Sequence, residues 1–120
     1  MVHILRFADR PPSKSRTIRF EGGEYGAAVS FFAVDIGPGE GPPLHVHPYS
    51  ETWIVKRGKG RFTAGDEVIE AGPNDILVVP PNVPHKFLNV GEDRLEVMCI
   101  HDTPTMEQRN LEQGRGRISR

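Results

Sequence analysis

Two histidines separated by a single residue, His45 and His47, have the best spacing in this 120-residue chain for binding a metal ion. In a β-strand, residues i and i+2 face the same side, about 6.6 Å apart along the strand, so two imidazoles can reach one ion. Glu51 has the same parity, and residues 48–50 can bend the chain so that its carboxylate turns toward the same point. These three residues are therefore candidate metal ligands.

A further histidine, His85, directly follows a segment with three prolines, residues 80–84. Because proline fixes φ, this segment is stiff and presents the imidazole on a rigid scaffold. Three imidazoles and one carboxylate form a mixed nitrogen and oxygen donor set, which suits a divalent ion of Fe, Mn, Ni, Zn or Cu. Each residue alone could be an ordinary surface or turn residue, and it is the full spacing that favours a site.

Short strands are the elements that must position these side chains. Thirteen glycines and eleven prolines interrupt the chain and exclude long helices. Strands are predicted over residues 27–36, 51–56, 61–64, 67–70, 76–79, 86–88 and 95–100. Gly65 and Asp66 predict a tight hairpin between two of them. Strands that recur every eight to twelve residues or so are typical of a sandwich or barrel.

One helix is predicted, near the end of the chain. Thr105 with Gln108 three residues later matches a capping box, and Gly114 can end the helix. The expected helix covers residues 106–113, and a frayed tail over residues 115–120 follows it.

Composition limits the classes of function. The net charge is −1 with mixed signs, which gives no field to attract nucleic acid or an acidic membrane. The single cysteine, Cys99, cannot form an internal disulfide and is expected to be a buried, inert thiol. The first residues contain no apolar signal region, and no stretch approaches the roughly 20 apolar residues of a membrane span. A cytoplasmic protein is the expectation.

The spacing of the candidate ligands resembles the cupin superfamily, in particular its small single-domain, conserved-barrel members. The first cupin motif, G-x5-H-x-H-x3-E-x6-G, is matched by Gly39, His45, His47, Glu51 and Gly58. The second motif, G-x5-P-x-G-x2-H-x3-N, is matched by Pro80, His85 and Asn89, with Asn74 and Asn82 at its two glycine positions. Because asparagine tolerates the left-handed conformation well, both turns remain plausible.

The resemblance implies an all-β fold, a double-stranded antiparallel β-helix or jelly-roll barrel, here with the short C-terminal helix. Residues 1–25 would form an N-terminal strand or arm, residues 26–101 the barrel, and residues 102–120 the helix and tail of the same single domain. It also implies that His45, His47, Glu51 and His85 bind one metal ion near a mouth of the barrel. Asn89 is expected to form a turn.

Strand parity then predicts which side chains face the interior. Trp53 and Val55 share the parity of Glu51, Phe87 shares that of His85, and Val97 and Cys99 alternate with Glu96. These five residues are the predicted substrate pocket, although plain core packing also explains Trp53 and Phe87.

Two residues are candidates for catalysis beside the ion. Glu51 could leave the ion and act as a base, and Tyr49 could donate a proton, although a tyrosine in a solvent-facing turn is the simpler interpretation. His101 ends a predicted strand and is expected at the surface.

The favoured function is a metal-dependent enzyme on a small organic substrate, either dioxygenase-like or an isomerase or lyase. The alternatives are a non-catalytic ligand-binding or sensor barrel and a structural barrel. Outward-facing Ile54 among other alternating apolar residues suggests a covered outer face, and single-domain cupins commonly dimerise. A homodimer that binds neither nucleic acid nor membrane is therefore expected.

Overall fold

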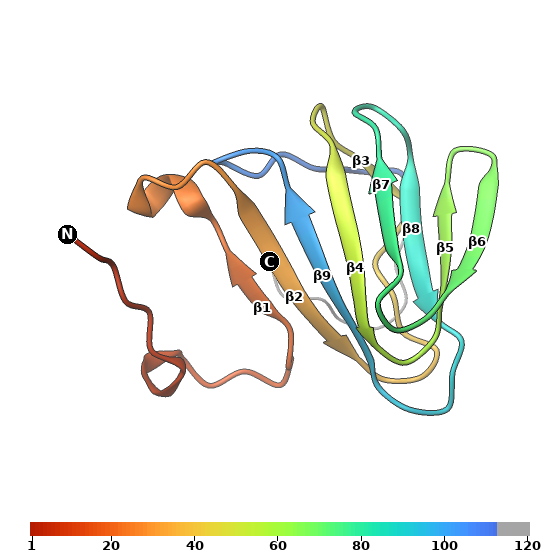
Figure 1. Cartoon of the computed structure of the whole chain (residues 1–120), viewed down its shortest axis with the longest axis horizontal. Coiled ribbons are helices and arrows are strands. Elements are labelled where there is room, and N and C mark those ends of the chain that lie inside the picture. The colour runs from red at the N-terminus through yellow and green to blue at the C-terminus, as the bar shows by residue number, and fades with distance from the viewer. Residues whose placement is uncertain (113–120) are drawn as a thin grey trace.

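The computed structural model describes residues 1–112 and shows two facing antiparallel sheets (Figure 1). The first sheet has the order β1-β2-β9-β4-β7 and the second the order β10-β3-β8-β5-β6. The strands are β1 (Ile18–Phe20), β2 (Ser30–Ile36), β3 (His45–Val46), β4 (Glu51–Arg57), β5 (Gly60–Ala64), β6 (Glu67–Ala71), β7 (Ile76–Val79), β8 (His85–Asn89), β9 (Leu95–His101) and β10 (Arg109–Asn110). The expected all-β barrel is confirmed.

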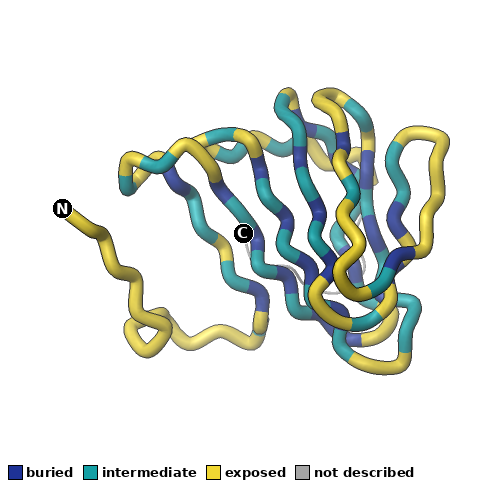
Figure 2. The backbone as a smooth tube through the Cα atoms, in the orientation of Figure 1, coloured by how far each residue is buried: buried dark blue, intermediate teal, exposed yellow. Residues whose placement is uncertain are grey.

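The long strands of the first sheet bury every second residue. Strands β2 and β9 alternate strictly between buried and partly buried side chains, and the first residues of β4 do the same (Figure 2). This period of two places one face of the sheet in the interior. Its buried apolar residues form one core with those of the second sheet: Phe32, Val34, Ile36, Trp53, Val55, Phe62, Ala71, Val79, Phe87, Leu95, Val97 and Cys99.

Residues 1–17 run outside the barrel beyond β1 and are almost all exposed (Figures 1 and 2). They include a single 3₁₀ turn, Phe7–Asp9, and a second 3₁₀ turn, Gly22–Tyr25, follows β1. No helix in the described part of the chain is long and apolar enough to cross a membrane.

The predicted C-terminal helix is wrong for the residues that can be compared, 106–112. No helix forms over these residues, and Arg109 pairs with Val46 in the second sheet. The Thr103 hydroxyl donates to the carbonyl of Thr105 at 2.7 Å, and the Met106 N–H donates to Glu21 Oε2 at 2.7 Å. The first of these bonds uses the Thr105 carbonyl, which a helix that begins at Met106 would need for its first turn, and Arg109 and Asn110 pair with β3 instead, so the capping pattern does not develop into a helix. Residues 113–120 lie outside the described part.

The motif positions that carry asparagine instead of glycine are tight turns, as predicted. Asn74 has φ of 73° and Asn82 has φ of 65°, both in the left-handed region. The two glycines of the first motif also have positive φ, 80° at Gly39 and 87° at Gly58. The conformation that the motif requires is therefore preserved by the residue type that tolerates it best after glycine.

We predict that the side chain at position 74 affects stability through φ alone. Asn74→Ala should lower the free energy of unfolding by about 1 kcal/mol, because alanine adopts the left-handed region at a higher cost. Asn74→Gly is the matched control and should match or slightly exceed the wild type. Urea unfolding of the three proteins measures this, and an alanine variant as stable as the glycine variant would contradict it.

Candidate metal centre

Both sheets contribute the four predicted ligands at one end of the barrel. His45 in β3 pairs directly with His85 at the start of β8, and Glu51 begins β4 in the opposite sheet. His47 follows β3 by one residue. All four side chains are buried, with between 1% and 5% of their surface exposed. The structure thus brings together residues that lie up to 40 positions apart in sequence.

The ligand atoms of these four residues lie within 4.8 Å of one another. Glu51 Oε1 is 2.8 Å from His47 Nε2 and 3.1 Å from His85 Nε2. The rings of His45 and His85 are 4.3 Å apart between centroids. The arrangement is a compact, buried cluster of nitrogen and oxygen donors.

Each of the three histidines is oriented by a backbone carbonyl at its other ring nitrogen. His45 Nδ1 is 2.6 Å from the carbonyl oxygen of Pro43, and His85 Nδ1 is 2.8 Å from that of Val83. His47 Nδ1 is 2.9 Å from the carbonyl oxygen of Glu107. Because a carbonyl only accepts hydrogen bonds, Nδ1 must carry the proton in each ring. A neutral ring then presents the lone pair of Nε2 to the cluster, as in metal-ligating histidines.

With the proton on Nδ1 of each ring, the cluster is suited to binding a cation. The Nε2 lone pairs of His47 and His85 point at a carboxylate oxygen that is itself an acceptor. Two acceptors at such short distances need a positive charge between them, from additional protons or from a metal ion. Burial lowers the pKa of His45 to about 4, so this imidazole is neutral at physiological pH. The donor set therefore fits a divalent transition metal.

The Glu51 carboxylate is ionised although it is buried. Burial by itself raises the pKa of this carboxyl, but positive charge at its contacts with the rings of His47 and His85, carried by additional protons or by a metal ion, outweighs burial and holds the pKa below its ordinary value. The second oxygen, Oε2, accepts a hydrogen bond of 2.7 Å from Trp53 Nε1. Both carboxylate oxygens are thus engaged.

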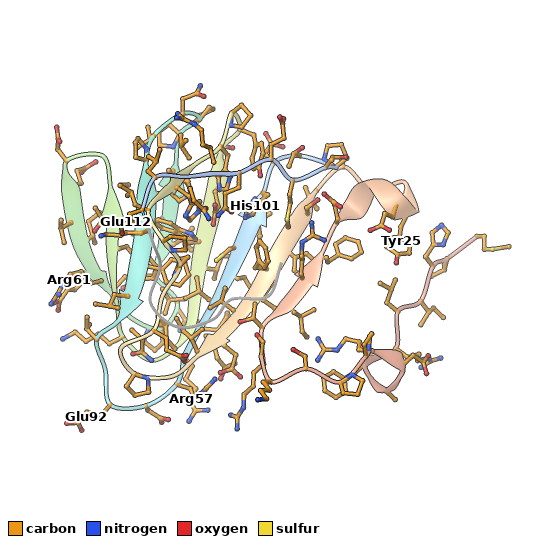
Figure 3. All side chains as sticks on the ribbon, turned by 180° about the vertical axis from the view of Figure 1, so that it is seen from behind. Tyr25, Arg57, Arg61, Glu92, His101 and Glu112 are labelled. Atoms are coloured by element: carbon orange, nitrogen blue, oxygen red, sulfur yellow. The ribbon has the colours of Figure 1, made fainter. Side chains whose placement is uncertain are left out.

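His101 is buried beside this cluster, which corrects its predicted surface position. Only 2% of its surface is exposed, and its Nε2 lies 3.4 Å from Glu51 Oε1 at the end of β9 (Figure 3). Burial lowers the pKa of His101 to about 4. A signal was available, because His101 shares the parity of Cys99 and so faces inward if the strand extends one residue further.

Tyr49 is partly buried beside the cluster. Its ring stacks on that of His47 with centroids 4.8 Å apart, and its hydroxyl lies 2.9 Å from His101 Nδ1. The same hydroxyl donates to the carbonyl of Glu107 at 3.0 Å and accepts from the N–H of that residue at 3.2 Å. Burial raises the pKa of Tyr49 to about 12, so the hydroxyl keeps its proton at neutral pH.

The five residues predicted to line a substrate pocket all lie in the interior beneath the cluster. They are Trp53, Val55, Phe87, Val97 and Cys99, each at most 3% exposed. The Trp53 ring contacts those of Phe62 and Phe87, with centroids 5.1 and 5.8 Å apart. Burial raises the pKa of the Cys99 thiol well above its ordinary value, as expected for an inert cysteine. A role of these residues in substrate binding stays a prediction.

A cavity of about 540 Å³ adjoins the cluster at His47. Its walls come from the β3 turn, from Asn82 and from the C-terminal segment. The lining residues are Val46, His47, Pro48, Asn82, Glu107, Gln108 and Arg109. Of the four candidate ligands, His47 is the one that this cavity reaches.

A buried cluster of three histidines and a glutamate at one end of two facing antiparallel sheets defines a metal-binding barrel of the cupin type. The chain belongs to the cupin family, because the model for the Cupin domain matches residues 32–101. This match covers more than half of the chain and includes all four candidate ligands and His101.

Individual curated proteins are similar to this chain in sequence. Protein SchB of Streptomyces halstedii is 30% identical over 102 residues, which cover 76% of this chain and 70% of that protein. An uncharacterized protein of Methanocaldococcus jannaschii, MJ1618, is 34% identical over 62 residues, 51% of this chain and 50% of that protein. The chain spans about half the length of the curated relatives it matches first.

Solved structures share the fold at low sequence identity. A mutant of Bacillus subtilis oxalate decarboxylase, OxdC, superposes with a TM-score of 0.77 at 20% identity, covering 89% of this chain and 31% of that one. This likeness establishes the architecture of the chain.

We predict that a divalent metal stabilises the protein through His85. At a metal concentration about 100 times the dissociation constant, the gain in stability should be about 2.7 kcal/mol. His85→Ala should weaken metal binding by about 100-fold or more, since it removes a ligand and not merely a supporting hydrogen bond. Calorimetric titration and thermal melts with and without chelator measure both effects.

The matched control for this experiment is His3→Ala, in the exposed arm. It should bind metal as the wild type does. Equal metal affinity in the His85 variant and the wild type would contradict the site.

Proposed function

We propose that this chain is a metal-dependent enzyme that acts on a small organic substrate, with dioxygenase-like or isomerase and lyase chemistry. The observation that carries the proposal is the convergence of the three oriented imidazoles with Glu51 Oε1 in one buried cluster. Such a site holds an ion through four protein atoms and leaves coordination positions for other molecules.

A bound Fe, Mn, Ni, Zn or Cu ion would supply Lewis acidity and a place for a substrate oxygen or dioxygen. Manganese has support from the similar oxalate decarboxylase of Bacillus subtilis, which was studied for its Mn(II) centres. That enzyme acts on a small carboxylate, and a small oxygen-bearing substrate is the class that we propose here.

The chain's own residues divide the remaining roles. Since both oxygens of Glu51 are engaged, we assign it first to holding the ion, and any action as a base would require it to leave His47 and Trp53. Tyr49, whose hydroxyl lies 2.9 Å from His101 Nδ1, is the proposed proton donor at the side of the cluster, and to act it would have to release the carbonyl of Glu107.

The substrate would enter through the cavity beside His47. Of the predicted pocket residues, Trp53 and Cys99 would contact the substrate first, because they pair with each other across β4 and β9 close to Glu51. Val55, Phe87 and Val97 would form the floor of the pocket. A cytoplasmic location is also proposed, on the evidence of a single buried, unpaired cysteine.

We predict that the Fe(II)-loaded protein consumes oxygen with catechols, flavonols or thiols if it is a dioxygenase. Turnover under nitrogen would instead assign it to isomerase or lyase chemistry. His47→Ala should abolish either activity, because it removes a ligand. Tight binding of all tested compounds without turnover would contradict an enzyme and favour a ligand-binding barrel.

We also propose that two copies associate through the outer face of the first sheet. Two rows of side chains cross this face from β1 to β7, and nine of the ten side chains are apolar. One row is Ile18, Ala33, Met98, Ile54 and Ile76, and the other is Phe20, Phe31, Ile100, Thr52 and Val78. Ile76 and Val78 are each 65% exposed.

The area of this face indicates what else the dimer must include. Five strands spaced about 4.8 Å apart and two rows about 6.7 Å apart cover roughly 300 Å². A stable interface needs about 800 Å² from each partner. The exposed apolar side chains of the N-terminal arm can supply the difference: Met1, Val2, Ile4, Leu5 and Phe7. A second copy of this chain offers both surfaces at once.

We predict that a charge on this face separates the two copies. Val78→Lys should convert a dimer of twice 13.4 kDa into a monomer, because the lysine would have to be buried in an apolar interface. Val68→Lys is the matched control, a valine of similar exposure (61%) on the other sheet, and should remain dimeric. Light scattering coupled to size-exclusion chromatography measures the masses. A monomeric wild type would contradict the proposal.

A further inference from the structure

We propose that Trp53 restricts Glu51 to a single metal-binding oxygen and thereby keeps a second coordination position open for substrate. The inference rests on the proposed metal site. It makes Trp53 a positioning residue and identifies the substrate as a chelator with two oxygens, or as a molecule that shares the ion with dioxygen.

The indole and the carboxylate meet because they are two residues apart on one strand. Glu51 and Trp53 both face the interior from β4. Trp53 Nε1 donates to Oε2 at 2.7 Å, whereas Oε1 lies 2.8 Å from His47 Nε2. The two oxygens of this carboxylate therefore have different partners: Oε1 faces the imidazoles and Oε2 faces the indole.

The indole is held firmly in this position. Only 1% of Trp53 is exposed, and its ring lies between aromatic neighbours, with centroids 5.1 Å from Phe62, 5.8 Å from Phe87 and 5.5 Å from His85. An indole N–H can only donate, so it requires an acceptor such as Oε2. A hydrogen bond to an ionised group in a buried site is among the stronger kinds.

The consequence follows from the number of donors. Three imidazole nitrogens and one carboxylate oxygen fill four positions of an ion that prefers six ligands, which leaves two. If Oε2 also bound the ion, only one position would remain. A chelating substrate needs two positions, and so does a substrate that shares the ion with dioxygen. The Trp53 hydrogen bond therefore maintains the vacancy on which such chemistry depends.

The sequence allows an experiment that removes this hydrogen bond alone, because the chain has a single tryptophan. Expression with benzothienylalanine replaces the indole N–H by sulfur and preserves the shape of the ring. Fluorotryptophan, which keeps the N–H, is the control. The probe is Mn(II), and the measurement is the line broadening of its electron paramagnetic resonance spectrum in H₂¹⁷O, which counts bound water oxygens.

Wild-type and fluorotryptophan proteins should bind about two water oxygens, and the benzothienylalanine protein about one. Equal counts in all three proteins would overturn the role of Trp53 while leaving the metal site intact. If the wild type does not bind Mn(II), Fe(II) or Zn(II), the proposed metal site itself fails, and this inference fails with it.

Genetic variants provide a second test that accounts for packing. Trp53→Phe removes the donor and some volume, and Phe62→Leu removes volume from the same aromatic cluster without touching Glu51. Both variants should lower the melting temperature of the metal-free protein. Only Trp53→Phe should lower the water count by about half. The same count in both variants would overturn the proposal.

Discussion

An ionised carboxylate buried at the mouth of an apolar barrel is the constraint on which this structure depends. Burial of an isolated charge is strongly unfavourable, and the group must be compensated by hydrogen bonds and opposite charge. Trp53 compensates one oxygen of Glu51. The other faces imidazole nitrogens whose protons are held on the far side of the rings by carbonyls, so a cation completes the compensation. Binding and folding at this end of the barrel are therefore coupled.

Two of the three histidines are oriented by carbonyls that are near in sequence, and the third is oriented by a carbonyl that is far away in sequence. His45 and His85 each contact the carbonyl two residues earlier, within their own turn. His47 depends on Glu107, 60 residues away, in the segment that pairs with β3 through Arg109. The Tyr49 hydroxyl bonds both the N–H and the carbonyl of that same residue. The segment after β9 is thus part of the metal centre, although it lies beyond the region that matches the family.

Strand parity and motif spacing predict much of this site, because both depend on neighbours in sequence. The inward faces of β4, β8 and β9 follow from a period of two, and the turns at Asn74 and Asn82 follow from backbone sterics. The C-terminal segment does not follow in this way. Its hydrogen bond from Met106 goes to Glu21, 85 residues earlier, and no local pattern contains that partner. A capping sequence indicates only what the segment would do alone.

The two ends of the barrel interior differ: one end is a packed apolar core, and the other holds the candidate metal site. Beneath the Trp53 ring, Phe62, Phe87 and Leu95 are all at most 3% exposed, so this half is a close-packed core. Space for a ligand must therefore come from the mouth, where Asn82 and residues 107–109 line the cavity beside His47. Since Glu107 also orients His47, we infer that the segment that limits the size of a ligand also holds a metal ligand in place. A change there would therefore alter both specificity and metal affinity.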